Sequence, residues 1–76
     1  MAKKIPLNAD IKGIVGRQVW RLRKEAGMTQ EMLANRCGIF RTYLSRVEGG
    51  TANPSITVLA DLATALGVSI TELFAE

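Results

Sequence analysis

Apolar residues recur along the first third of the chain with the spacing of one helix face. The steps between them are four, four, three and four positions, which brings them to the same side of an α-helix with 3.6 residues per turn. The residues on this face are Ile11, Val15, Val19, Leu22 and Ala26. The pattern predicts an amphipathic helix that ends before Gly27.

Two short helices follow, and each is marked by residues that begin or end helices. Thr29 is placed to cap the start of the second helix, and Gly38 is placed to end it in a left-handed conformation. The third helix is predicted over about residues 41–48 and closes at Gly49-Gly50. Very few residues join the second helix to the third, so we expect them to cross at a steep angle.

The last part of the chain predicts two more helices and no strand. Ser55 caps a fourth helix whose apolar stripe ends at Gly67, and Ser69-x-x-Glu72 has the spacing of a capping box that opens a short fifth helix. The helical period is nowhere replaced by the period of two that marks a half-buried strand. The predicted fold class is therefore all-α, a compact bundle of five short helices in which helices 2 and 3 form a helix-turn-helix.

Length and composition allow one small domain and exclude several kinds of site. The chain has 76 residues, and we expect residues 1–10 to form an N-terminal arm and residues 11–76 to form the folded domain. It contains no histidine and a single cysteine, Cys37, which excludes a Cys/His zinc site, a Cys-His pair and a Ser-His-Asp triad. We expect Cys37 to be a core residue, and we expect no enzyme activity, no metal and no cofactor.

Membrane association is not indicated by the sequence. No apolar run approaches the ~18 residues of a membrane span, and the first ten residues lack the apolar core of a signal peptide. We therefore expect a cytoplasmic protein with no membrane partner.

The charges are divided unevenly along the chain. All ten Lys and Arg residues lie between Lys3 and Arg46, and the net charge is +7 for residues 1–46 and −4 for residues 47–76. This division indicates a cationic surface that meets a polyanion and an acidic remainder that faces away from it. The alternative is a chance imbalance on solvated faces.

The third helix has two chemically different sides. Phe40, Leu44 and Val47 fall on one side at 100° per residue, and the polar residues spread over the other. The polar set is Arg41, Thr42, Ser45 and Arg46. A helix anchored on its apolar side and offering arginines and hydroxyls on the other is suited to reading base edges in a major groove about 12 Å wide.

Residues 15–74 resemble the Cro/repressor-type (lambda-repressor-like, xenobiotic-response-element) helix-turn-helix family. The matching segments are Val19-x-x-Leu22-Arg23, GMTQEMLA, Gly38, LSRVEGG, NPS and LADLATALGVSITELF. The segment RTYLSRVEGG also resembles the recognition segment of restriction–modification controller proteins. The resemblance implies sequence-specific binding of double-stranded DNA by a transcriptional regulator whose third helix, about residues 41–48, lies in the major groove.

The resemblance also assigns the residues that contact DNA. It implies base contacts from the polar side of the third helix, namely Arg41, Thr42, Ser45 and Arg46. Arginine can bond the O6 and N7 atoms of one guanine together. The alternative for these residues is an ordinary solvated helix face.

Four further residues are candidates for contacts with the DNA backbone. The resemblance implies that Gln30 binds a phosphate at the start of the second helix, and the alternative is a solvated first-turn residue. Tyr43 can reach a phosphate with its hydroxyl or simply pack its ring. Thr51 and Asn53 follow the third helix, and Asn53 can instead hold the turn before Pro54.

The resemblance implies that Arg23 and Glu48 form the internal ion pair of the family, which ties the first helix to the end of the third. Its implied role is structural, because it fixes the angle of the reading helix without touching a base.

Two positions depart from the family pattern. Phe40 stands where Ser or Thr usually caps the third helix, and we expect its ring to pack beside Leu44, with contact to a thymine methyl as the alternative. Met32 stands where a capping-box glutamate is common.

Trp20 lies off the apolar face of the first helix, on a strip with Gly13 and Gly16. Glycines there are expected to leave a flat groove, which the N-terminal arm (Ile5, Pro6, Leu7) or a partner subunit fills. The alternative is a half-exposed tryptophan.

The expected partners are double-stranded DNA and a second copy of the chain, because one short helix reads few base pairs. The exposed side of the fifth helix is the expected homodimer surface, through Ile70, Leu73 and Phe74. The alternative function is an antitoxin or adaptor that uses the same fold mainly for protein–protein interaction.

Overall fold

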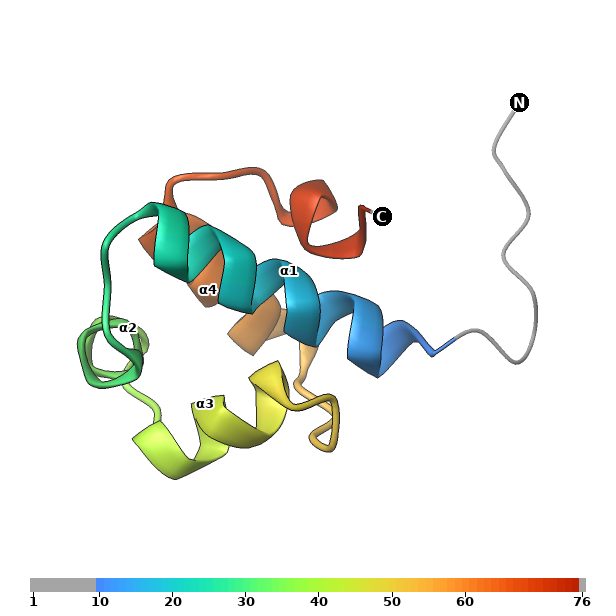
Figure 1. Cartoon of the computed structure of the whole chain (residues 1–76), viewed down its shortest axis with the longest axis horizontal. Coiled ribbons are helices and arrows are strands. Elements are labelled where there is room, and N and C mark those ends of the chain that lie inside the picture. The colour runs from blue at the N-terminus through green and yellow to red at the C-terminus, as the bar shows by residue number, and fades with distance from the viewer. Residues whose placement is uncertain (1–9, 76) are drawn as a thin grey trace.

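The computed structural model describes residues 10–75, which form an all-α bundle. Four α-helices are followed by one 3-10 helix, and this part of the chain contains no strand (Figure 1). The elements are α1 (Ile11–Glu25), α2 (Gln30–Cys37), α3 (Arg41–Glu48), α4 (Ile56–Leu66) and η1 (Ile70–Phe74). The predicted fold class is confirmed, except that the fifth helix is a 3-10 helix.

The ends of the helices follow local sequence signals. Thr29 and Ser55 each accept a hydrogen bond from the backbone N–H three residues on, at 3.1 and 3.2 Å, as predicted for N-caps. Gly38 and Gly67 end α2 and α4 with φ of 65° and 72°, a left-handed conformation that glycine adopts without steric cost. Asp10, which the sequence analysis did not assign, caps α1.

The predicted capping box at the fifth helix is wrong. The hydroxyl of Ser69 accepts from the N–H of Thr71 at 3.4 Å, whereas the N–H of Glu72 donates to the backbone carbonyl of Ser69 at 3.0 Å. The physical reason is the tight 3-10 turn, in which each carbonyl pairs with the N–H three residues on. The backbone therefore uses the donor that a capping box would give to the serine side chain.

The core receives apolar side chains from every element. Figure 1 shows α1 lying between η1 and α3, with α4 behind it. The largest fully buried side chains are Leu33, Leu44, Leu62, Leu73, Val19 and Val47. On α1 the predicted face is only partly correct, because Ile11 and Ala26 at its two ends are exposed and Ile14, which was not predicted, is buried.

The groove predicted along Gly13 and Gly16 is wrong, because the chain itself fills it. A Cβ at Gly16 would lie 2.5 Å from the backbone oxygen of Val47, and one at Gly50 would lie 3.2 Å from the Cα of Gly13. The glycines let the end of α3 lie directly on the backbone of α1. Trp20 is 51% exposed, and the arm residues 5–7 lie outside the described residues.

Candidate nucleic-acid interface

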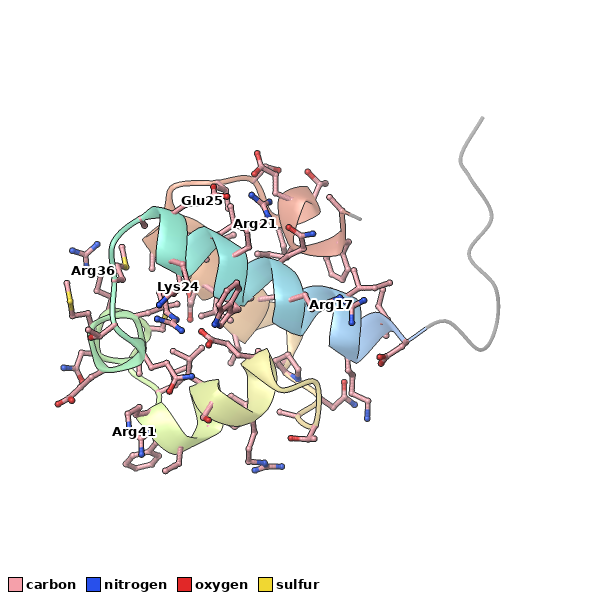
Figure 2. The ribbon with its side chains drawn as sticks, in the orientation of Figure 1. Arg17, Arg21, Lys24, Glu25, Arg36 and Arg41 are labelled. Carbon is pink, nitrogen blue, oxygen red and sulfur yellow. The ribbon has the colours of Figure 1, made fainter. Side chains whose placement is uncertain are left out.

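The two sides of α3 have different surroundings. Leu44 and Val47 are fully buried against the core, and Tyr43 packs partly against it. Figure 2 shows Arg41 projecting from the outer end of α3, away from α1. The side chains exposed on α3 include the whole predicted base-contact set, Arg41, Thr42, Ser45 and Arg46.

The C-terminal end of α3 is held by a buried ion pair. Arg23 on α1 donates to both carboxylate oxygens of Glu48, from Nε at 2.6 Å and from Nη2 at 3.0 Å. Its remaining nitrogen donates to the carbonyl of Met28 at 2.8 Å, and the two charged side chains are 8% and 4% exposed. This bidentate geometry ties α3 to α1 and to the turn before α2.

Gln30 belongs to the same network. Its Nε2 donates to Oε1 of Glu48 at 3.0 Å, so the side chain lies between the start of α2 and the end of α3. An amide nitrogen carries two hydrogens, and only one is used in this bond. The structure thus brings Gln30, Arg23 and Glu48 together.

The other residues predicted to contact the DNA backbone, Tyr43, Thr51 and Asn53, lie on or just after α3. Thr51 donates its hydroxyl to the carbonyl of Arg46 at 3.3 Å, and its N–H donates to the same oxygen at 3.0 Å. Asn53 is exposed in the same loop, next to Pro54. Thr51 therefore holds the loop against the end of α3.

The position of Phe40 corrects the expectation that its ring packs beside Leu44. The ring is 82% exposed, whereas Leu44 is fully buried without it. Phe40 is the residue before the helix and has extended backbone dihedrals, φ −73° and ψ 144°, so helical spacing does not decide where its side chain points. No side-chain hydrogen bond caps the start of α3.

The predicted dimer surface is also corrected. Leu73 is fully buried and belongs to the core, and Ile70 packs partly against the core. Phe74 is 41% exposed, while Ile56 at the start of α4 is 75% exposed. A five-residue 3-10 helix repeats every three residues, so the face that it buries could not be taken from an α-helical period.

Among residues 10–75, most of the cations outside the predicted contact set lie on α1, and Arg36 lies on α2. Figure 2 shows Arg17, Arg21 and Lys24 along this helix, where Lys24 lies 5.9 Å from the ring centroid of Trp20. Arg21 pairs with Glu25 at 2.7 Å. Within residues 10–75 every Lys and Arg residue thus lies on α1, α2 or α3, so the charge imbalance seen in the sequence is also an imbalance between parts of the fold.

Cys37 packs partly against the core. Burial first and the carboxylate of Asp61 second raise the pKa of the Cys37 thiol above its ordinary value, so the reactive thiolate is scarce at neutral pH. Across residues 10–75 no three His, Cys, Asp or Glu residues are grouped to hold a metal ion. The helices in this range include none long and apolar enough to span a membrane.

Known proteins are similar to this chain in both sequence and fold. The family described as Helix-turn-helix (HTH_3) matches residues 21–73. The uncharacterized HTH-type transcriptional regulator y4dJ of Sinorhizobium fredii is 47% identical over 64 residues, which cover 84% of this chain and 83% of y4dJ.

Two solved structures superpose on most of the chain. The restriction-modification controller protein C.AhdI from Aeromonas hydrophila has a TM-score of 0.80 and 38% identity, with 83% of this chain and 96% of that chain covered. SinR of Bacillus subtilis, a master regulator for biofilm formation, in complex with DNA has a TM-score of 0.76 and 34% identity, with 80% and 98% covered. These matches confirm the resemblance to repressor-type and controller proteins, and the chain belongs to the helix-turn-helix family HTH_3.

Proposed function

We propose that this chain is a cytoplasmic transcriptional regulator that binds double-stranded DNA sequence-specifically, with α3 in the major groove. The observation that carries this proposal is the pair of opposite faces on α3. One face is buried in the core and the other exposes two arginines and two hydroxyls. The similarity to SinR, which has been solved in complex with DNA, supports the same function.

The dimensions of α3 suit this task. Eight residues at 1.5 Å each give a helix about 12 Å long, which spans only a few base pairs. At 100° per residue, the four exposed polar side chains cover an arc of about 140° opposite Leu44 and Val47. Arg41 and Arg46 lie at the two edges of this arc, so they can address different base pairs.

The residues around α3 are suited to hold it in the groove. Gln30 at the start of α2 keeps one amide hydrogen for a phosphate, and free backbone N–H groups of the same helix end point toward the same anion. Thr51, Asn53 and the hydroxyl of Tyr43 supply further backbone contacts. The ion pair of Arg23 with Glu48 fixes the angle at which α3 enters.

The base preference of the protein tests the proposal that α3 contacts the base edges. We expect selection from a random duplex pool at ~150 mM salt to enrich one site. Arg41→Ala and Arg46→Ala are each expected to relax the preference at one position and to cost ~1–3 kcal/mol of binding free energy there. The measurement is the sequence logo and the Kd of each protein on the selected duplex.

Arg36→Ala is the matched control, since Arg36 is an exposed arginine on α2 (Figure 2). We expect this variant to keep the base preference unchanged and at most to lower the affinity for all duplexes by the same factor. An unchanged preference in both α3 variants would contradict the assignment. Absence of duplex binding at low salt would favour the antitoxin or adaptor function instead.

Two copies of the chain are expected to bind together on DNA. A two-fold dimer places its reading helices about 34 Å apart and doubles the number of base pairs read. Exposed apolar side chains are available for this contact at Ile56 and Phe74. Phe74 lines a shallow groove of about 110 Å³ with Leu59, which lies one helical turn after Ile56 on α4.

Ile56→Lys tests this surface. The change places a charge in the proposed contact, so we expect the complex on a two-fold duplex to fall from two protomers to one, with little effect on the folding of the monomer because Ile56 is exposed. Analytical ultracentrifugation of the protein–DNA complex measures the stoichiometry. Thr57→Lys adds the same charge at an exposed neighbouring position and should leave two protomers bound. A two-protomer complex in both variants would place the dimer surface elsewhere.

A further inference from the structure

Phe40 has no role in the core or in capping its own helix. Its ring is the most exposed large apolar side chain among residues 10–75, at 82%. A phenyl ring left in water forgoes the stabilisation that burial of such a side chain supplies. The same position forgoes the side-chain cap that α2 and α4 both have. The ring therefore contributes little to the stability of the free protein.

The ring lies at the end of α3 that enters the groove. Phe40 immediately precedes Arg41, the first residue of the helix, and the N-terminal residues of a recognition helix are those that reach base edges. Thymine presents a 5-methyl group in the major groove, and apolar side chains, phenylalanine among them, contact it. An exposed phenyl ring and an exposed methyl group gain by excluding water from each other.

We propose that Phe40 is a specificity-determining residue whose ring packs on the 5-methyl group of a thymine next to the base pair addressed by Arg41. This inference rests on the proposed function, because it requires α3 in the major groove. It adds an apolar contact to a set of reading residues that is otherwise polar. The ring also explains why an uncapped helix start is tolerated: the position serves the DNA complex.

Deoxyuridine provides the test, because it differs from thymidine only in lacking this methyl group. Each thymidine of the selected duplex is replaced in turn, and the Kd is measured for the unmodified protein and for Phe40→Ala. We expect one replacement to raise the Kd of the unmodified protein about fourfold, which is equivalent to about 0.8 kcal/mol for one buried methyl group. Phe40→Ala should bind the original duplex more weakly and be insensitive to that replacement.

Phe40→Ser separates recognition from folding. Serine is a good N-cap, so this variant is expected to be at least as resistant to thermal unfolding as the unmodified protein. It should nevertheless lose the sensitivity to deoxyuridine, as Phe40→Ala does. Loss of thymine discrimination in a protein that is no less stable cannot be attributed to a damaged helix.

Three results would overturn the inference. The first is that no deoxyuridine replacement raises the Kd of the unmodified protein. The second is that a replacement raises the Kd of the unmodified protein and of Phe40→Ala by the same factor, which assigns the methyl contact to another residue. The third is a Phe40→Ala protein weakened equally on every duplex, which indicates a contact with the DNA backbone. All three still require a selected duplex, whereas failure to select any duplex is failure of the proposed function itself.

Discussion

Glu48→Ala is expected to lower the free energy of unfolding by about 3–5 kcal/mol, because it leaves the guanidinium of Arg23 buried without its counter-charge. The variant also removes the hydrogen-bond acceptor of the Gln30 amide, which donates to the same carboxylate. A domain of 76 residues has a total stability of only about 4–11 kcal/mol. Chemical denaturation should therefore show a large fraction of the stability lost, as a midpoint well below that of the unmodified protein.

Glu25→Ala is the matched control for this prediction. Glu25 pairs with Arg21 at 2.7 Å, but the two side chains are 60% and 46% exposed, so water screens the interaction. Loss of such a pair costs about 0.5 kcal/mol or less. If Glu48→Ala cost no more than Glu25→Ala, the buried pair would not hold α3 against α1.

A double substitution distinguishes the orientation of α3 from the stability of the fold. Replacing Arg23 and Glu48 together by Met and Leu removes both charges, and such swaps of a buried pair are often neutral for stability. If the pair sets the angle of α3, this double variant should remain folded and lose affinity for the selected duplex.

Most helix ends could be predicted from the sequence because their causes are local, although the cap of α1 by Asp10 was missed and the capping box at Ser69 was wrong. A serine or threonine cap and a left-handed glycine act within four residues, and Thr29, Gly38, Ser55 and Gly67 all do so. The exposure of the polar side of α3 is similarly local, since arginine and hydroxyl side chains without a buried partner rarely enter an apolar core, and Arg23 is buried only together with Glu48. The class of fold and the candidate reading face follow from these signals.

The remaining features depend on contacts between residues distant in the sequence. The strip of Gly13 and Gly16 has the same sequence signature whether it is an open groove or a close contact, and only the position of α3 shows that it is a contact. The hydrogen bond of Gln30 with Glu48 joins residues 18 positions apart. Burial of Leu73 depends on how η1 docks against α1 and α4, which the period of so short an element does not fix.

Gly16→Ala is expected to destabilise the protein by about 3 kcal/mol, the upper end of the usual range for overpacking. The new methyl group would lie 2.5 Å from the backbone oxygen of Val47 and 2.7 Å from that of Glu48. Backbone oxygens cannot rotate away as a flexible side chain can, so α3 must move off α1. The gain of about 1 kcal/mol in helix propensity from glycine to alanine does not offset this clash.

The displacement of α3 should also affect DNA binding beyond the loss of stability. Moving the end of α3 shifts the carboxylate of Glu48 relative to Arg23 and changes the angle of the reading face. The Kd on the selected duplex, measured at low temperature where the variant is still folded, should therefore rise. Gly49→Ala is the matched control, because Gly49 has φ −79° and its Cβ would lie 3.3 Å from the backbone oxygen of Ser45 and 3.8 Å from that of Arg46, without the close clash found at Gly16. We expect that change to stay within about 0.5 kcal/mol of the unmodified protein. Equal unfolding midpoints for the two alanine variants would mean that α3 does not need the bare backbone of α1 to reach its position.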